Sequence, residues 1–108
     1  MNALDQPLLV DKFVYNTAAG KEMGHLGLLE TTHYFNWSNG VASGVVEIES
    51  ADDAGYTGTW APVATITFSG TSPKQDVYRV QGAYKALRHR ISTIVNGGTV
   101  TSRILGSR

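Results

Sequence analysis

Turn signals recur at short intervals along the sequence, and they separate runs rich in β-branched and aromatic residues. Clusters of Gly, Asn, Asp, Ser and Pro mark turns, whereas such runs are typical of strands. No run predicts a helix. The sequence therefore predicts an all-β protein, a single β-sandwich or jelly roll of seven to eight antiparallel strands. The expected strands are residues 8–15, 21–30, 31–37, 45–50, 60–68, 75–80, 84–95 and 98–105.

The clearest local signal is a C-terminal hairpin. Residues 84–95 form one expected arm, Asn96-Gly97 the turn, and residues 98–105 the other arm. Asn-Gly supplies the positive φ angles that a type I′ turn requires. His89 alternates with Leu87 and Ile91 on the first arm, so we expect its side chain to point to the core or to the rim of the core.

Length and composition exclude several classes of protein. A chain of 108 residues fits one domain. It contains no cysteine, which excludes a disulfide framework, a zinc–thiolate site, an iron–sulfur centre and a thiol nucleophile. No apolar run approaches the ~20 residues of a membrane span, and the formal net charge is zero. We therefore expect neither a membrane nor nucleic acid as a partner.

The zero net charge hides an asymmetry between the two parts of the chain. Residues 1–73 carry a net charge of −6 and residues 74–108 a net charge of +6. The simplest interpretation is that the two parts pair their charges inside one fold. A second interpretation is an acidic face and a basic face that dock neighbouring copies head to tail. Contact of the basic part with nucleic acid is a third, weaker one, because no cluster of aromatic and basic residues accompanies the charges.

The search for metal-binding and catalytic motifs is negative. The three histidines, His25, His33 and His89, do not have the spacing of a metal site. Residues 52–55 (DDAG) resemble the opening of a calcium loop, but its later ligands are missing, so a plain turn is expected. We predict no enzyme and no catalytic residue, cofactor or metal ligand.

Glu47 and Glu49 lie two residues apart on one face of an expected strand. Two carboxylates on one face could serve a glycosidase. Arg88 and Arg90 have the same spacing on another strand, however, and cross-strand pairs of opposite charge stabilise sheets. We predict that the glutamates pair with these arginines, as largely exposed ion pairs.

Three aromatic residues, Trp37, Tyr56 and Trp60, lie at or beside expected turns. Exposed aromatic rings near loops could stack on sugar rings, as in a carbohydrate-binding module. The alternative is that Trp37 and Trp60 close the two ends of the core.

From Val45 onward the order of features resembles a known family. VVEIES (45–50) leads through DDAG (52–55) to WAPVATI (60–66), and VQGAYKALRHRI (80–91) and NGGTVT (96–101) follow. This order is similar to small β-sandwich proteins in the virions of tailed bacteriophages. Their pattern is a strand, an Asp-Gly turn and Trp-x-x-Val, then Gly-x-Tyr-x-x-x-Arg-x-Arg and Gly-Thr-Val-Thr. The likeness covers residues 45–105 and departs from that pattern at the longer turn 52–55.

The resemblance implies a non-enzymatic structural protein located in the virion. Within that class we expect a capsid decoration or cement protein that binds and stabilises the major capsid shell, with a head–tail or tail-fibre component as the alternative. The implied partners are the major capsid protein or other virion subunits, together with further copies of the chain in a homo-oligomer such as a trimer. A carbohydrate-binding module is the alternative from another class.

The N-terminal residues are expected to make contacts outside the sandwich. We divide the chain into an arm, residues 1–7, and a sandwich domain, residues 8–108, because Pro7 does not suit a central strand. The arm, extending as far as Asp11, would grip a neighbouring subunit; the alternative for Leu8–Tyr15 is the first strand of its own sandwich. The expected interface residues are Leu4, Pro7, Arg88, Arg90 and Arg103.

The core is expected to gather inward-facing apolar residues from several strands. These residues are Val46, Ile48, Trp60, Val63, Ile66, Leu87, Ile91, Val100 and Ile104.

Overall fold

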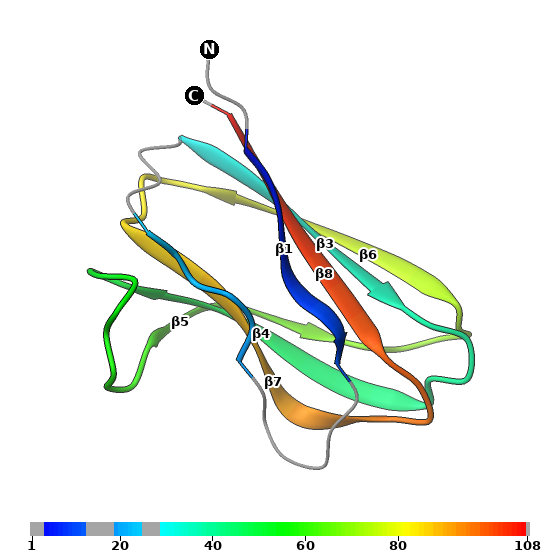
Figure 1. The fold of residues 1–108 in the computed structure, drawn as a ribbon. Coiled ribbons are helices and arrows are strands. Elements are labelled where there is room, and N and C mark those ends of the chain that lie inside the picture. The colour runs from blue at the N-terminus through cyan, green and yellow to red at the C-terminus, as the bar shows by residue number, and fades with distance from the viewer. Residues whose placement is uncertain (1–3, 13–18, 25–28, 108) are drawn as a thin grey trace.

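The computed structural model describes residues 4–12, 19–24 and 29–107, which form eight antiparallel strands in two sheets (Figure 1). The β-sandwich expected from the sequence is therefore confirmed. No helix long and apolar enough to cross a membrane occurs in the described ranges. The strands are β1 (Leu4–Lys12), β2 (Met23–Gly24), β3 (Glu30–Trp37), β4 (Ser43–Ala51), β5 (Ala61–Thr67), β6 (Lys74–Gln81), β7 (Ala86–Asn96) and β8 (Val100–Ser107).

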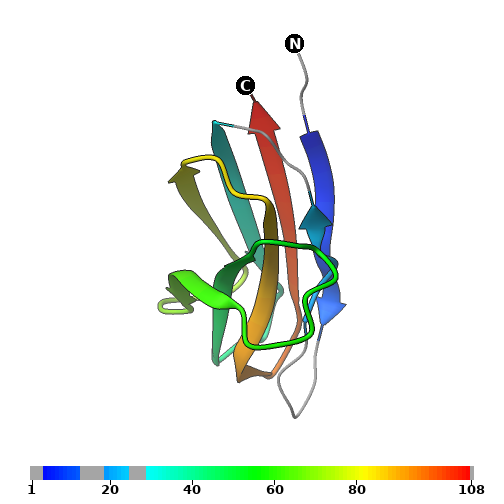
Figure 2. The same ribbon diagram turned by 90° about the vertical axis from the view of Figure 1, so that its left-hand side faces the viewer.

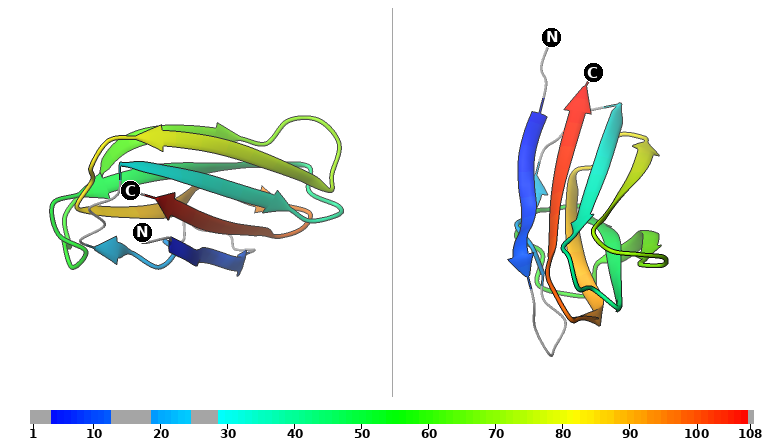
Figure 3. Two further views of the ribbon diagram at one scale, coloured as in Figure 1. Left: turned by 90° about the horizontal axis from the view of Figure 1, so that it is seen from above. Right: turned by 90° about the vertical axis from the view of Figure 1, so that its right-hand side faces the viewer.

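Each sheet contains four strands that are not consecutive in the sequence. The strand order is β1-β8-β3-β6 in the first sheet and β2-β7-β4-β5 in the second. Figure 2 shows β8 and β7 in different layers, and the view from above in Figure 3 shows β6, β3, β8 and β1 following one another across the first sheet. Because the connections cross between layers, residues far apart in the sequence face each other across the core.

The predicted pairing of residues 84–95 with residues 98–105 in a C-terminal hairpin is wrong. The turn at Asn96-Gly97 does connect two strands, and Gly97 has a positive φ of 90°. However, β7 pairs with β2 and β4, whereas β8 pairs with β1 and β3. The turn therefore passes from one sheet to the other, so that the apolar faces of β7 and β8 meet across the core instead of lying side by side.

The predicted inward faces are confirmed for most of the core. Six of the expected residues are buried in one cluster: Val46, Ile48, Leu87, Ile91, Val100 and Ile104. Val63 and Ile66 are half-buried and pack against this cluster. Its aromatic members include Phe35 and Trp37, and the Trp37 ring meets Phe68 edge-on at 5.3 Å.

Trp60 is buried but not where the sequence predicted it. Its side chain is 2% exposed, yet it lies outside the core cluster. The guanidinium of Arg88 lies 4.5 Å from the centre of its ring. Arg88 alternates with the buried residues Leu87 and His89, so it projects from the outer face of the second sheet. Trp60 therefore covers this outer face, at the end of the connection from β4 to β5.

The N-terminal segment differs from the expected arm from Leu4 onward. Strand β1 pairs with β8 of the same chain, from Leu4 opposite Gly106 to Lys12 opposite Val100. Leu8 and Leu9 are 2% and 0% exposed, because both side chains enter the core. Pro7 is exposed on this edge strand, where a missing N–H is tolerated. Residues 1–3 and 13–15 lie outside the described residues, and contact of the segment with a neighbouring subunit stays a prediction.

Replacement of Ile91 by Ala tests the inward face of β7. Ile91 is fully buried in the core cluster, so Ile91→Ala should lower the free energy of unfolding by about 2–5 kcal/mol. Urea denaturation followed by circular dichroism measures the change. Val10→Ala removes methyl groups from an exposed side chain of β1 and should change it by less than about 0.5 kcal/mol. Equal effects of the two substitutions would contradict the assigned core.

Candidate functional site

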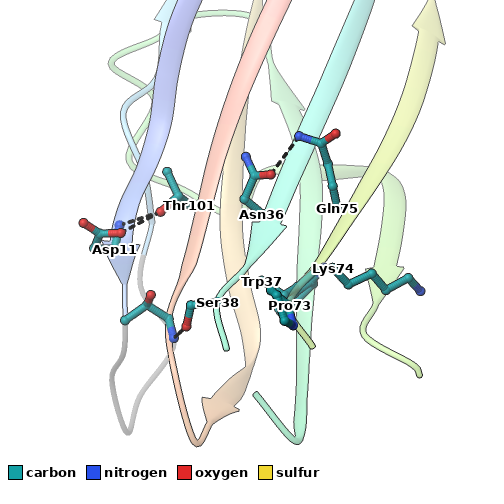
Figure 4. A pocket seen from close by; sticks show the side chains of 9 residues that line it. Asp11, Asn36, Trp37, Ser38, Pro73, Lys74, Gln75 and Thr101 are labelled. Atoms are coloured by element: carbon teal, nitrogen blue, oxygen red, sulfur yellow. Dashed lines mark hydrogen bonds between the residues drawn. The ribbon is translucent and has the colours of Figure 1, made fainter. Parts of the chain in front are cut away.

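A shallow groove of about 450 Å3 crosses one end of the outer face of the first sheet (Figure 4). Its polar lining comes from β1, β8, β3 and β6. The Asn36 carbonyl oxygen accepts a hydrogen bond from the Gln75 amide at 2.7 Å, and the Asp11 carboxylate accepts one from the Thr101 hydroxyl at 2.8 Å. The groove therefore offers amides, hydroxyls and a carboxylate on a rigid sheet, a set suited to hydrogen bonding with a polar or protein partner. No local sequence pattern predicts this groove, because its residues come together only through the order of the strands.

A second polar group of residues lies inside the core and joins the two sheets. His33 Nδ1 on β3 lies 2.7 Å from His89 Nε2 on β7, so one ring donates a hydrogen bond to the other. At the far sides, His33 Nε2 lies 2.8 Å from Thr31 Oγ1, and His89 Nδ1 lies 2.6 Å from Ser102 Oγ. Ser102 Oγ also accepts a hydrogen bond from the Leu9 backbone N–H at 3.1 Å. We call these five residues the histidine chain.

The histidine chain satisfies its polar groups without needing any charge. A neutral imidazole has one donor and one acceptor nitrogen. With two neutral rings, each contact in the chain can therefore pair one donor with one acceptor, and the donors can all point in either direction along the chain. If both rings were protonated, Nδ1 of His33 and Nε2 of His89 would point hydrogens at each other. The prediction that His89 faces the core is confirmed, while His25 lies outside the described residues.

Burial lowers the pKa of both rings. It lowers the pKa of His33 from 6.5 to about 4. Burial, and then the neighbouring His33, hold the pKa of His89 well below its ordinary value. Both rings are therefore neutral at pH 7, and the histidine chain acts as a fixed polar crosslink inside the core.

Because both buried histidines have a lowered pKa, we predict that the protein loses stability in mild acid. Below pH 6.5 the unfolded chain binds protons at His33 and His89 that the folded chain does not bind. Stability is therefore fully present above about pH 6.5 and falls as the pH approaches 4. We expect the free energy of unfolding to drop by about 2 kcal/mol between pH 7 and pH 5 from His33 alone.

Denaturation in urea at pH 7, 6 and 5 measures this drop. The measurement is made in the His25→Gln background, so that the third histidine does not contribute to the difference. Equal stability at pH 7 and pH 5 would contradict the assignment of two neutral buried rings.

Glu49, Arg88 and Arg90 form an ion-pair cluster on the outer face of the second sheet. Glu49 Oε1 accepts from Arg88 Nε at 2.9 Å, and Oε2 accepts from Arg90 Nε at 3.0 Å. The predicted pairing is thus confirmed for Glu49, but its exposure is not: the Glu49 side chain is 6% exposed. Arg88 is held between Glu49 and the ring of Trp60, whose indole N–H donates to the Tyr56 carbonyl at 3.0 Å.

Glu47 lies opposite Arg90 in the register but takes other partners. Its two oxygens accept from the hydroxyls of Thr65 at 2.7 Å and Ser92 at 2.8 Å. The predicted pairing with an arginine is therefore not seen for Glu47. The two carboxylates also have structural partners throughout, which argues against a glycosidase role, since a general acid needs a carboxyl held protonated in an apolar pocket.

The aromatic residues proposed for sugar stacking have different accessibilities. Trp37 is 1% exposed and Trp60 is 2% exposed, so neither ring can lie against a ligand, and stacking by these two residues is ruled out. Trp37 packs in the core, where its indole N–H reaches Asp76 at 2.9 Å. Tyr56 is 47% exposed and remains accessible.

The remaining predicted residues take ordinary structural places. At residues 52–55, Asp53 Oδ1 accepts from the Gly55 N–H at 3.3 Å, as in a plain turn, and no group of metal-ligating side chains occurs among the described residues. Leu4 packs against the core from β1, and Arg103 on β8 pairs with Asp5 at 3.0 Å. Arg88 and Arg90 are engaged by Glu49. The interface role of these residues stays a prediction.

Comparison with known proteins shows likeness in fold alone. No family model matches the sequence, and no curated protein matches it either. A solved structure described as "Bacillus endospore appendages form a novel family of disulfide-linked pili" has a TM-score of 0.61 at 14% identity, over 97% of this chain and 87% of that one. The SPBc2 prophage-derived protein YomS has a TM-score of 0.60 at 10% identity, over 98% and 95% of the two chains. In both cases the whole sandwich is shared, not one sheet of it.

Replacement of Glu49 by Gln tests the ion-pair cluster. The substitution leaves Arg88 and Arg90 close together without the buried carboxylate that holds both. It should lower the free energy of unfolding by about 3 kcal/mol. Glu47→Gln, on the same strand, keeps an acceptor oxygen for one of the two hydroxyls of Thr65 and Ser92, and its amide N–H can donate to the other, because a hydroxyl also accepts. It should cost less than about 1 kcal/mol. Chemical denaturation that gives equal losses for the two variants would contradict the assigned role of Glu49.

Proposed function

We propose that the chain is a non-enzymatic structural protein of a tailed-bacteriophage virion, and within that class a decoration protein that binds the major capsid shell. The observation that carries the proposal is the fold of the whole chain. One eight-stranded sandwich takes up the described residues, and it superposes from end to end on a prophage-derived protein and on a subunit of appendage pili. The sequence pattern from Val45 to Leu105 resembles virion β-sandwich proteins independently of this superposition.

The strand order supports the same proposal. In the orders 1-8-3-6 and 2-7-4-5, successive strands alternate between sheets up to β4, and the last strand returns beside the first. This is the order of an eight-stranded jelly roll built from two Greek keys, an architecture common in viral capsid proteins and in lectins. We therefore propose that the sandwich is a jelly roll.

Most of the ion pairs join the acidic part of the sequence to the basic part within one chain. Acidic residues before position 74 pair with basic residues after it in four ion pairs: Asp5–Arg103, Glu30–Arg79, Glu49–Arg88 and Glu49–Arg90. The opposite charges of the two parts thus meet inside one fold, which favours the first interpretation of the asymmetry over an acidic and a basic docking face.

The alternatives differ in what they would bind. A head–tail or tail-fibre component shares every feature named above and differs in its position on the particle. A carbohydrate-binding module is less favoured, because two of the three aromatic rings assigned to sugar stacking are buried.

Immunoelectron microscopy of purified phage particles that carry this chain tests the proposal. We expect label spread over the capsid surface in many copies. Label confined to the neck or tail would replace the capsid assignment by the head–tail or tail-fibre alternative. Particles without label, together with glycan-array binding by the isolated chain, would overturn the structural role.

A further inference from the structure

The outer face of the sheet β1-β8-β3-β6 carries three rows of side chains, each crossing all four strands. The first row contains Asp5, Leu105, Thr32 and Arg79. The second row contains Pro7, Arg103, Tyr34 and Val77. The third row, in the groove, contains Asp11, Thr101, Asn36 and Gln75. These side chains lie on the face opposite the core, since the buried residues Phe35, Val80 and Ser102 alternate with them on β3, β6 and β8.

Charged and apolar groups are distributed unevenly across this face. Asp5 and Arg79 lie at opposite edges of the first row. Each already has an ion-pair partner in its own chain, Arg103 for Asp5 and Glu30 for Arg79, but their side chains remain 56% and 67% exposed. In the second row Pro7 is exposed at one edge and Val77, 54% exposed, at the other. Arg103 and Tyr34 lie on the two central strands between them. In each row, the side chains on β1 and β8 therefore differ from those on β3 and β6 and can complement them.

Such a face can meet its own copy about a twofold axis in one of two simple orientations. An axis perpendicular to the strands, through the second row, places Arg103 opposite Arg103 of the second copy and Asp5 opposite Asp11 of the second copy. Like charges facing each other in this way are unfavourable. An axis parallel to the strands, between β8 and β3, exchanges the two halves of every row.

The parallel axis gives complementary contacts in all three rows. In the first row, Asp5 meets Arg79 of the second copy. In the second row, Pro7 meets Val77 of the second copy, and Arg103 lies over the Tyr34 ring of the second copy, as in a cation–π contact. In the third row, Asp11 meets Gln75 of the second copy. In an interface between two identical faces each contact occurs twice, so both partners of every contact must lie on the same face. The three rows meet this requirement.

We propose that this face is the interface of a homodimer whose twofold axis runs parallel to the strands between β8 and β3. Sheets packed face to face keep their strands within about 30° of each other. The central contact of Arg103 with Tyr34 is therefore the most sharply defined, and the long Arg79 side chain reaches its partner at the edge. Arg and Tyr at the centre of an interface are the residue types that contribute most to binding.

The size of the face fits a weak dimer. Four strands about 4.8 Å apart and eight residues long at about 3.3 Å each cover about 500 Å2 per copy. The pair buries about 1,000 Å2, close to the lower limit for a specific interface, so we expect a weak dimer that dissociates on dilution. The inference depends on this face alone, and it holds whether or not the chain belongs to a virion.

A charge exchange tests the interface. Asp5 and Arg79 are separated by three strand spacings, about 14 Å, within one chain, so neither contacts the other there. Arg79→Glu and Asp5→Arg should each weaken the dimer about tenfold, since each places like charges together twice across the interface. The in-chain ion pairs that these substitutions break, Arg79–Glu30 and Asp5–Arg103, are lost in the monomer and the dimer alike, so their loss largely cancels from the dissociation constant. The double variant Asp5→Arg/Arg79→Glu should return the dissociation constant to within about threefold of the parent. Rescue of this kind can arise only between copies.

Sedimentation equilibrium of the full chain over a concentration series measures the dissociation constants, with circular dichroism to verify that each variant is folded. Lys85→Glu and Asp52→Arg, which make the same charge changes at exposed residues outside this face, are the matched controls and should leave dimerisation unchanged. Tyr34→Ala, which changes no charge, should also weaken it about tenfold. A chain that stays monomeric, a trimer, or a dimer insensitive to the single variants would overturn the proposal. A monomer that binds capsids through this face would assign the face to another virion subunit instead.

Discussion

The hydrogen bond between His33 and His89 sets the relative position of the two sheets. It lies in an otherwise apolar core, where a polar group without a partner costs about 1–3 kcal/mol. Each ring nitrogen must therefore find its partner, and the partners belong to β3, β7 and β8, with the backbone of β1 reached through Ser102. Sliding either sheet past the other would break the two bonds that join them, His33–His89 and His89–Ser102. Apolar packing supplies most of the stability, whereas this chain of bonds specifies one alignment of the layers.

The same alignment determines what the outer faces present. With alternate residues fixed inward, the second sheet turns Glu49, Arg88 and Arg90 outward, where they form an ion-pair cluster around the nearly buried Glu49, and the ring of Trp60 lies against Arg88. The first sheet turns outward a face of exposed side chains in aligned rows. The two outer faces thus have different properties: the part of the second sheet under Trp60 is covered by its own chain, while the first remains available for contact with another subunit.

Alternation along single strands could be predicted from the sequence, and pairing between strands could not. The inward positions of β4, β7 and β8 follow directly from residue patterns such as Val46-Glu47-Ile48. The pattern around Asn96-Gly97 indicated a turn correctly, but a turn does not specify whether the next strand continues in the same sheet or crosses to the other. The prediction that Trp60 lies in the core was wrong for a related reason. Its hydrophobicity predicts burial, but the connection from β4 to β5 determines which face of the sheet it covers. The groove residues Asp11 and Thr101 are brought together by the pairing of β1 with β8, which no local pattern encodes.

Nitrogen-15 NMR of the imidazole rings shows whether the two buried histidines are neutral and hydrogen-bonded to each other. We expect His33 and His89 each to carry one N–H at pH 5.5, one of them in the hydrogen bond between Nδ1 of His33 and Nε2 of His89. We also expect that neither ring titrates above about pH 5. A coupling across that hydrogen bond would identify the donor ring. Two rings that titrate near pH 6.5, or that show no coupling to each other, would contradict a neutral histidine pair holding the sheets together.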